Sequence, residues 1–219
     1  MIRYILFDMD GLMVDSERAT FDLLKEIREK YGFSLDLATY SRNMGQKIDE
    51  YSRKNKASVI PPEIRKKIDE EWTLRFYELA ENGKIPAKPG LFELLDYCDA
   101  HGIRKVVVSS SIPRRVHALL NSDHIIERVD GVIDGSSVTK SKPDPQPYLL
   151  GAALVHAGPS ECLVLEDSIN GIESGHNAGM KVIWIPDLGE PDEEHASLCA
   201  AVLPSLLEVR DWLDKENHD

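Results

Sequence analysis

Asp8 and Asp10 stand two residues apart, after a run of β-branched and aromatic residues at positions 3–7 and before Gly11. Such a run is typical of a buried strand, where residues i and i+2 point the same way, so both carboxylates can enter one cavity. Two carboxylates there repel each other unless a cation or a shared proton is present, and oxygen-only ligands favour Mg²⁺. Gly11 would let the backbone turn tightly beside a ligand. An isolated Asp-x-Asp pair more often belongs to a solvated turn, so a catalytic role for this pair needs support from the rest of the chain.

Three further polar groups follow apolar runs or lie near them. Ser109 ends the run at 106–108, Lys142 lies in Ser-Lys-Pro-Asp-Pro at 141–145, and Glu166-Asp167 ends the run at 162–165. Taken singly, each has a simpler interpretation: Ser109 as a helix cap, Lys142 as a surface lysine and Glu166-Asp167 as an acidic loop. Together with Asp8 and Asp10 they suit phosphoryl transfer, which needs a nucleophile, a metal, donors to the phosphoryl oxygens and a proton-transfer group.

These residues can meet only if the strands form one parallel sheet, because ligands bind such sheets at the carboxyl ends of the strands. Strands and helices alternate as βαβ units require. The pattern predicts an α/β fold, with a Rossmann-like, mostly parallel core at 1–14 and 86–219 and an inserted α-helical cap at 15–85. Strands are predicted at 3–7, 106–108, 132–133, 162–165, 182–185 and 202–203. Helices are predicted from Ser16 towards Gly32, near 47–56, from Pro62 onward, and at 91–100, 113–120, 147–155, 168–178 and 206–213.

The composition is that of an ordinary globular protein of 219 residues, with 42% hydrophobic and 29% charged residues. A formal net charge of −12 excludes a nucleic-acid backbone as a favoured partner. The three cysteines have no metal-ligand or CxxC spacing and fit a reducing compartment. No apolar run approaches membrane-spanning length, and the first residues carry acids instead of a signal-peptide core. We therefore expect a cytoplasmic monomer with no membrane partner.

Four motifs resemble those of the haloacid dehalogenase superfamily, and the resemblance covers essentially the whole chain, including the helical insert. The motifs are Phe7-Asp8-Met9-Asp10-Gly11, Val108-Ser109-Ser110, Lys142-Pro143-Asp144 and Leu165-Glu166-Asp167-Ser168.

The resemblance implies a role for each motif residue. Asp8 would be the nucleophile that forms an aspartyl-phosphate, and Asp10 the acid and base that serves the leaving oxygen and then water. Ser109, with Ser110, and Lys142 would hold the phosphoryl oxygens. Mg²⁺ would bind to the Asp8 carboxylate, the Asp10 backbone carbonyl and Asp167, with Glu166 beside them.

The resemblance also implies a Mg²⁺-dependent phosphomonoesterase for a small phosphorylated metabolite, with a sugar phosphate as the best guess for the substrate. True dehalogenases lack the acid at Asp10. Mutases similar to β-phosphoglucomutase have a histidine about where Thr20 stands and an arginine after the cap-loop glycine, and this chain lacks both. Hydrolase is therefore favoured over mutase, which stays the alternative. A regulatory protein on the same fold would have lost a motif residue, and none is lost. The cap residues expected to select the substrate are Arg42, Asn43, Gln46 and Lys47.

Overall fold

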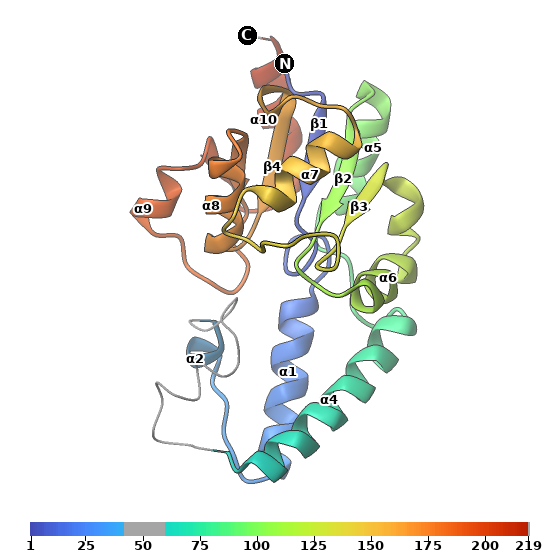
Figure 1. Cartoon of the computed structure of the whole chain (residues 1–219), viewed down its shortest axis with the longest axis vertical. Coiled ribbons are helices and arrows are strands. Elements are labelled where there is room, and N and C mark those ends of the chain that lie inside the picture. Colours follow the sequence, from blue (N-terminus) through green and yellow to red (C-terminus); the bar gives the residue numbers. More distant parts are fainter. Residues whose placement is uncertain (42–59, 219) are drawn as a thin grey trace.

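A computed structural model describes residues 1–41 and 60–218 of the chain as a parallel sheet between helices, with a pair of long helices projecting from one end (Figure 1). The strands are β1 (Tyr4–Phe7), β2 (Arg104–Val108), β3 (Gly131–Ile133), β4 (Cys162–Glu166), β5 (Lys181–Trp184) and β6 (Ala201–Val202). The α-helices are α1 (Ser16–Lys30), α2 (Leu37–Ser41), α4 (Pro62–Glu81), α5 (Leu91–His101), α6 (Pro113–Ser122), α7 (Gln146–Leu154), α8 (Ile169–Asn177), α9 (Glu193–Ala196) and α10 (Leu207–His218).

The sheet has the order β3-β2-β1-β4-β5-β6, and every pair of neighbours is parallel. The N-terminal strand β1 therefore lies in the interior, with Phe7 beside Val107 of β2 and Leu165 of β4. Strand order reverses on either side of β1, which is where an open α/β sheet forms its ligand crevice. The α/β fold, the inserted helical cap and all six strands predicted from sequence are confirmed.

The two faces of the sheet are both buried, as the continuous apolar runs of parallel strands require. Side chains alternate along β1: Ile5 and Phe7 pack into a cluster with residues of α5, α6 and α10, whereas Leu6 faces Tyr148 of α7 and Ile172 of α8. Helices therefore cover the sheet on both sides.

The cap consists of α1 and α4, which lie side by side, together with the short helix α2 (Figure 1). Ion pairs join the two long helices: Lys30 Nζ is 2.7 Å from Glu71 Oε2, and Arg75 donates two hydrogen bonds of 2.9 Å to Glu26. Apolar residues at helical spacing in α4 would be expected to share one buried side, yet Leu74 among them is 74% exposed. Helical spacing at that position carried it to the outer face. The helix predicted near 47–56 lies outside the described residues.

The two linkers between core and cap pair with each other. The Asp15 N–H donates to the Pro86 carbonyl, and the Lys88 N–H donates to the Met13 carbonyl, both at 2.9 Å. The cap boundaries at 15 and 85 stay a prediction, and this pairing is what supports them.

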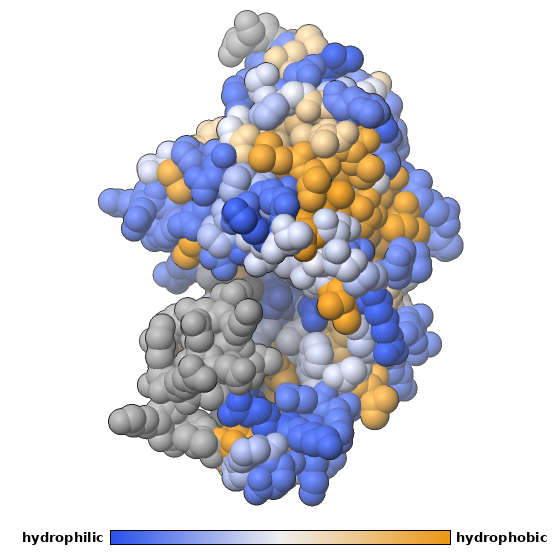
Figure 2. Space-filling model, viewed as in Figure 1, coloured by the Kyte–Doolittle hydropathy of each residue, from blue (hydrophilic) through white to orange (hydrophobic). Residues whose placement is uncertain are grey.

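The surface is largely hydrophilic in the view of Figure 2, apart from an apolar area over α7, where Leu149 and Leu154 are exposed. Among the helices of residues 1–41 and 60–218, none is both long enough and apolar enough to span a membrane.

Candidate active site

The predicted motif residues meet at the carboxyl ends of β1, β2 and β4. Asp8 follows β1 directly, and its N–H donates to the Leu165 carbonyl of β4 at 3.0 Å. Ser109 follows β2 and is 3% exposed, while Glu166 is the last residue of β4 and is fully buried. Ser110, the next residue, is exposed. Parallel pairing alone brings residues more than 150 positions apart to one edge of the sheet.

Lys142 is held in a buried position by four oxygens. Its Nζ donates to Asp8 Oδ1 at 2.5 Å, Glu166 Oε1 at 2.7 Å, the Val108 carbonyl at 2.9 Å and the Tyr148 hydroxyl at 3.0 Å. Burial alone would lower the pKa of Lys142, but the carboxylates of Asp8 and Glu166 outweigh burial and raise it. Lys142 is therefore a permanent, fixed cation beside Asp8.

Glu166 is fully buried and holds Lys142 in position. Its Oε1 accepts hydrogen bonds from Lys142 and from Tyr148 at 2.7 Å, and its Oε2 accepts from the Asp167 and Ser168 N–H groups at 3.1 Å. Gly171 makes room for this carboxylate, because a Cβ at Gly171 would lie 1.7 Å from Glu166 Oε1. Nothing in the sequence indicated a site role for Tyr148, which lies among the apolar residues of a predicted helix.

Asp8, Glu166 and Asp167 form a cluster whose ligand oxygens lie within 4.8 Å of one another. Burial raises the pKa of Asp8 to about 8, with Lys142 opposing the rise and Glu166 adding to it. Burial, followed by the charges of Asp8 and Glu166, raises the pKa of Asp167 well above its usual range. A cation placed among these groups would favour their ionised forms. The all-oxygen donor set fits a magnesium ion.

The turn after β1 leaves space beside this cluster. Gly11 has φ +82°, and a Cβ there would lie 2.3 Å from Asp167 Oδ2 and 3.2 Å from Asp187 Oδ2. Any side chain at Gly11 would therefore enter the region beside Asp167 and Asp187, and the positive φ agrees with the tight turn predicted from the sequence. Asp187 was not among the predicted site residues.

Hydrogen-bond donors surround the Asp10 carboxylate. Its Oδ1 accepts from Ser16 at 2.7 Å and from Arg115 Nη2 at 2.8 Å and Nε at 3.0 Å, and its Oδ2 accepts from Ser111 at 2.8 Å. Burial alone would raise the pKa of Asp10, but Arg115, Ser16 and Ser111 outweigh burial and lower it. Ser16 is the first residue of α1, where the sequence predicted this helix to begin, and its hydroxyl donates to Asp10.

Arg115 also connects this carboxylate to the cap. It lies on α6 of the core, yet its guanidinium lies 4.4 Å from the ring centre of Phe76 and 5.9 Å from that of Trp72, both on α4. Arg115 is thus the second cation of the site after Lys142. The sequence shows it only as one of two arginines after Pro113, which is also what a solvated helix start looks like.

The cap contributes a carboxylate and a phenol near Asp10. Tyr40 donates a hydrogen bond of 2.7 Å to Glu17 Oε2, and burial followed by the charge of Asp10 raises the pKa of Glu17. The predicted cap residues Arg42, Asn43, Gln46 and Lys47 lie outside the described residues. Glu17 was seen in the sequence only as part of a helix start.

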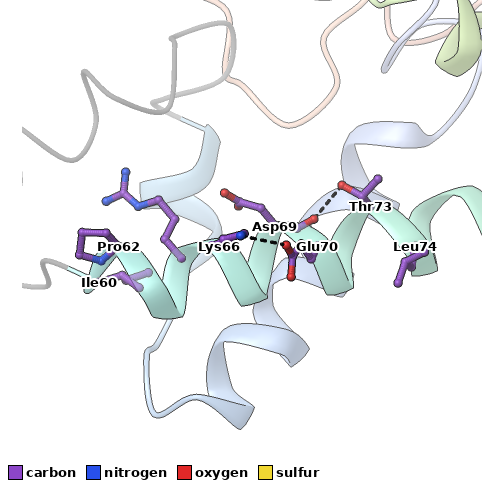
Figure 3. A pocket seen from close by; sticks show the side chains of 8 residues that line it. Ile60, Pro62, Lys66, Asp69, Glu70, Thr73 and Leu74 are labelled. Carbon is purple, nitrogen blue, oxygen red and sulfur yellow. Dashed lines mark hydrogen bonds and ion pairs between the residues drawn. The ribbon is translucent and has the colours of Figure 1, made fainter.

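A separate open groove of about 900 Å³ runs along the outer side of α4 (Figure 3). Its charges are largely paired with one another, as between Lys66 and Glu70 at 3.8 Å, and it contains none of the motif residues. Its lining consists of Ile60, Pro62, Arg65, Lys66, Asp69, Glu70, Thr73 and Leu74. The candidate active site is therefore the sheet edge, where the motif residues lie.

Comparisons with known proteins agree with this geometry. The chain is 31% identical over 210 residues to the bifunctional riboflavin kinase/FMN phosphatase of Arabidopsis thaliana, covering 94% of this chain but only 54% of that protein. It is 25% identical over 189 residues to the phosphorylated carbohydrates phosphatase of Thermotoga maritima, covering 82% of this chain and 83% of that one.

Among solved structures, CbbY of Rhodobacter sphaeroides in complex with phosphate superimposes with a TM-score of 0.79 at 28% identity. The match covers 95% of this chain and 96% of CbbY. The model of the haloacid dehalogenase-like hydrolases matches residues 5–185, a span that includes all four motifs and the cap. With its four motifs gathered at one sheet edge under a helical cap, the chain is an enzyme that belongs to the haloacid dehalogenase-like hydrolases.

Proposed function

We propose that the protein is a Mg²⁺-dependent phosphatase that hydrolyses a small phosphorylated metabolite through an aspartyl-phosphate. One observation carries this proposal: the Asp8 carboxylate lies at the open end of β1 with Lys142 Nζ 2.5 Å from its Oδ1. A carboxylate that attacks a phosphate dianion needs a fixed cation beside it, since the two anions otherwise repel each other. Relatives named as phosphatases support the same reaction class.

In the first step an Asp8 oxygen attacks phosphorus, and a bond forms between that oxygen and phosphorus while the bond from phosphorus to the substrate oxygen breaks. Lys142 and the Ser109 hydroxyl offer donors to the phosphoryl oxygens. Asp10 gives its proton to the departing oxygen, which leaves as an alcohol. The products of this step are the alcohol, the Asp8 acyl-phosphate and an ionised Asp10.

In the second step water attacks phosphorus of the acyl-phosphate and passes its proton to Asp10. The bond between Asp8 and phosphorus breaks, which returns Asp8 as a carboxylate and releases inorganic phosphate. The ionised Asp10 held by Arg115, Ser16 and Ser111 is in the base form that this step requires. The first step instead requires the protonated form of Asp10, so Asp10 must lose its contact with Arg115, which favours the ionised form, and hydrogen-bond to the leaving oxygen.

Asp8 and Asp167 are the residues that would hold Mg²⁺, with Glu166 keeping Lys142 in place beside them. The ion, when bound, offsets negative charge on the transferring phosphoryl group.

The cap side of the site supports a polyhydroxylated substrate. Glu17 offers carboxylate oxygens that accept hydrogen bonds from hydroxyl groups, and Tyr40 fixes its position. Closure of the cap over the crevice would exclude water and bring this pair against the leaving group. A sugar phosphate fits these contacts, in line with the phosphorylated carbohydrates named for the Thermotoga relative.

The test is release of inorganic phosphate from a panel of sugar phosphates, nucleotides and short phospho-acids with Mg²⁺ present. We expect turnover of at least one sugar phosphate, its loss with EDTA and its return with Mg²⁺. Asp8→Asn should abolish turnover, whereas Asp96→Asn, at an α5 site with a 72% exposed side chain, should not change it. Near wild-type turnover by Asp8→Asn would rule out the aspartyl-phosphate.

The same assay separates a hydrolase from a mutase. Position 20 holds a threonine where the mutases have their histidine, so water is the expected acceptor and phosphate should appear without a bisphosphate activator. Interconversion of glucose 1-phosphate and glucose 6-phosphate faster than phosphate release would identify a mutase instead.

A further inference from the structure

A second pair of charged residues lies at the edge of the acidic cluster. Asp187 follows β5, and Lys88 lies in the linker that returns from the cap. Lys88 Nζ is 2.6 Å from Asp187 Oδ1 and 3.6 Å from Asp15 Oδ1. The Asp187 side chain is only 7% exposed. Neither residue belongs to the four motifs.

The other oxygen of Asp187 is buried and has no hydrogen-bond partner within residues 1–41 and 60–218. A buried carboxylate oxygen without a donor is costly, so an unpaired one calls for a group that supplies a proton or a charge. The anchor through Lys88 engages Oδ1, so Oδ2 stays available for another donor.

Asp187 Oδ2 faces the same space as Asp167. A Cβ on Gly11 would meet Asp167 Oδ2 and Asp187 Oδ2 as two of its nearest atoms, which places both oxygens around the glycine backbone. Asp187 is not part of the tight cluster of Asp8, Glu166 and Asp167. It is therefore placed for the outer layer of a cation site, and not for direct ligation.

Magnesium ions usually keep several of their water ligands, and such waters donate hydrogen bonds to outer carboxylates. We propose that Asp187, anchored by Lys88, is a positioning residue of the cation site that accepts through Oδ2 a hydrogen bond from a metal-bound water. This inference rests on the cation of the proposed function. It assigns Asp187 an effect on cation affinity that a plain ion pair between linker and β5 loop would not have.

The test measures binding of Mn²⁺ alone to the full chain, from the free Mn²⁺ signal in electron paramagnetic resonance and from water-proton relaxation. Asp187→Asn should weaken Mn²⁺ binding by about 10-fold, the lower end of the range for outer-layer partners of metal sites. Asp187→Glu keeps the charge but moves the oxygens, and it should weaken binding as well. Asp15→Asn removes the other acid near Lys88 and should change the affinity less than about twofold, as for a screened charge.

If the Mn²⁺ affinity of Asp187→Asn stays within about twofold of the wild-type affinity, the inference is overturned, because an outer-layer partner should contribute about 10-fold. Wild-type affinity in Asp187→Glu would overturn it too, because charge alone would then account for the effect. Thermal unfolding of each variant shows that the folded state is being compared. Failure of the proposed function has a different signature, namely a wild-type chain that binds Mn²⁺ but releases no phosphate from any phosphomonoester.

Discussion

Replacing Arg115 by alanine should destabilise the protein by far more than a surface arginine would. The substitution removes three things at once: two hydrogen bonds to Asp10 Oδ1, the compensating charge for that carboxylate, and the stacking on Phe76. Breaking a buried ion pair from one side costs about 3–5 kcal/mol. Because the Arg115 and Asp10 side chains are 16% and 17% exposed, and Asp10 keeps Ser16 and Ser111, we expect a smaller loss, about 2–3 kcal/mol.

The assay is unfolding by urea and by heat, in which this loss should lower Tm by about 4–12 °C for a chain of this size. Arg114→Ala is the matched control on the same helix. The Arg114 side chain is 64% exposed, with its guanidinium 3.6 Å from Glu81, so its loss should cost no more than about 1 kcal/mol. In an Asp10→Asn background the cost of Arg115→Ala should shrink, because the charge that Arg115 compensates is gone.

The pH dependence gives a further check on the same pair. The pKa of Asp10 is lowered from 3.8 on folding, so the stabilisation is present above pH 3.8 and is lost as the pH falls through the lower folded value. The stability difference between wild type and Arg115→Ala should therefore be constant near neutral pH and narrow under strongly acidic conditions. A cost no larger than that of Arg114→Ala, or a cost that is the same with and without the Asp10 carboxylate, would refute the reasoning.

Three further outcomes are expected. Lys142→Met should abolish phosphate release and cost about 3–5 kcal/mol in urea unfolding, because it leaves the buried carboxylates of Asp8 and Glu166 without their cation; wild-type turnover would exclude a role in catalysis. Gly171→Ala should destabilise by about 1–3 kcal/mol, measured the same way, because its methyl group would collide with the Glu166 carboxylate; an unchanged midpoint would contradict that collision. Asp10→Asn should slow hydrolysis of alkyl phosphates more than that of activated aryl phosphates, which need little protonation, whereas equal losses would indicate a purely structural role.

The site residues that directly follow or end a strand could be predicted from the sequence. Asp8, Ser109 and Glu166 each follow an apolar run, and parallel pairing of those runs leaves one place for their side chains to meet. Lys142 follows no strand; the sequence offered it as one polar group near an apolar run, and its specific role in holding the phosphoryl oxygens came from the family resemblance. The strands were predictable for the same reason, since buried parallel strands are short and almost wholly apolar.

Residues that reach the site from the side of a helix could not be predicted. Arg115 and Tyr148 lie on α6 and α7, and their contacts depend on how each helix packs on the sheet and the cap. The position of the Asp187 side chain depends on the backbone path of the loop after β5. Helical periodicity specifies a buried face but not which polar side chain at the edge of that face points inward. Leu74 is the converse case, an apolar side chain of a helix that is exposed.

The interior position of β1 also has a consequence for how the chain is made. The ribosome makes β1 before either of its neighbours, because β2 and β4 follow only with residues 104–108 and 162–166. The cap helices in between can form from local contacts, whereas the apolar strand that carries Asp8 must wait for partners distant in sequence. The residues of the cap helices are therefore made before the catalytic edge can assemble, and β1 gains its second neighbour only after residues 162–166 have been translated.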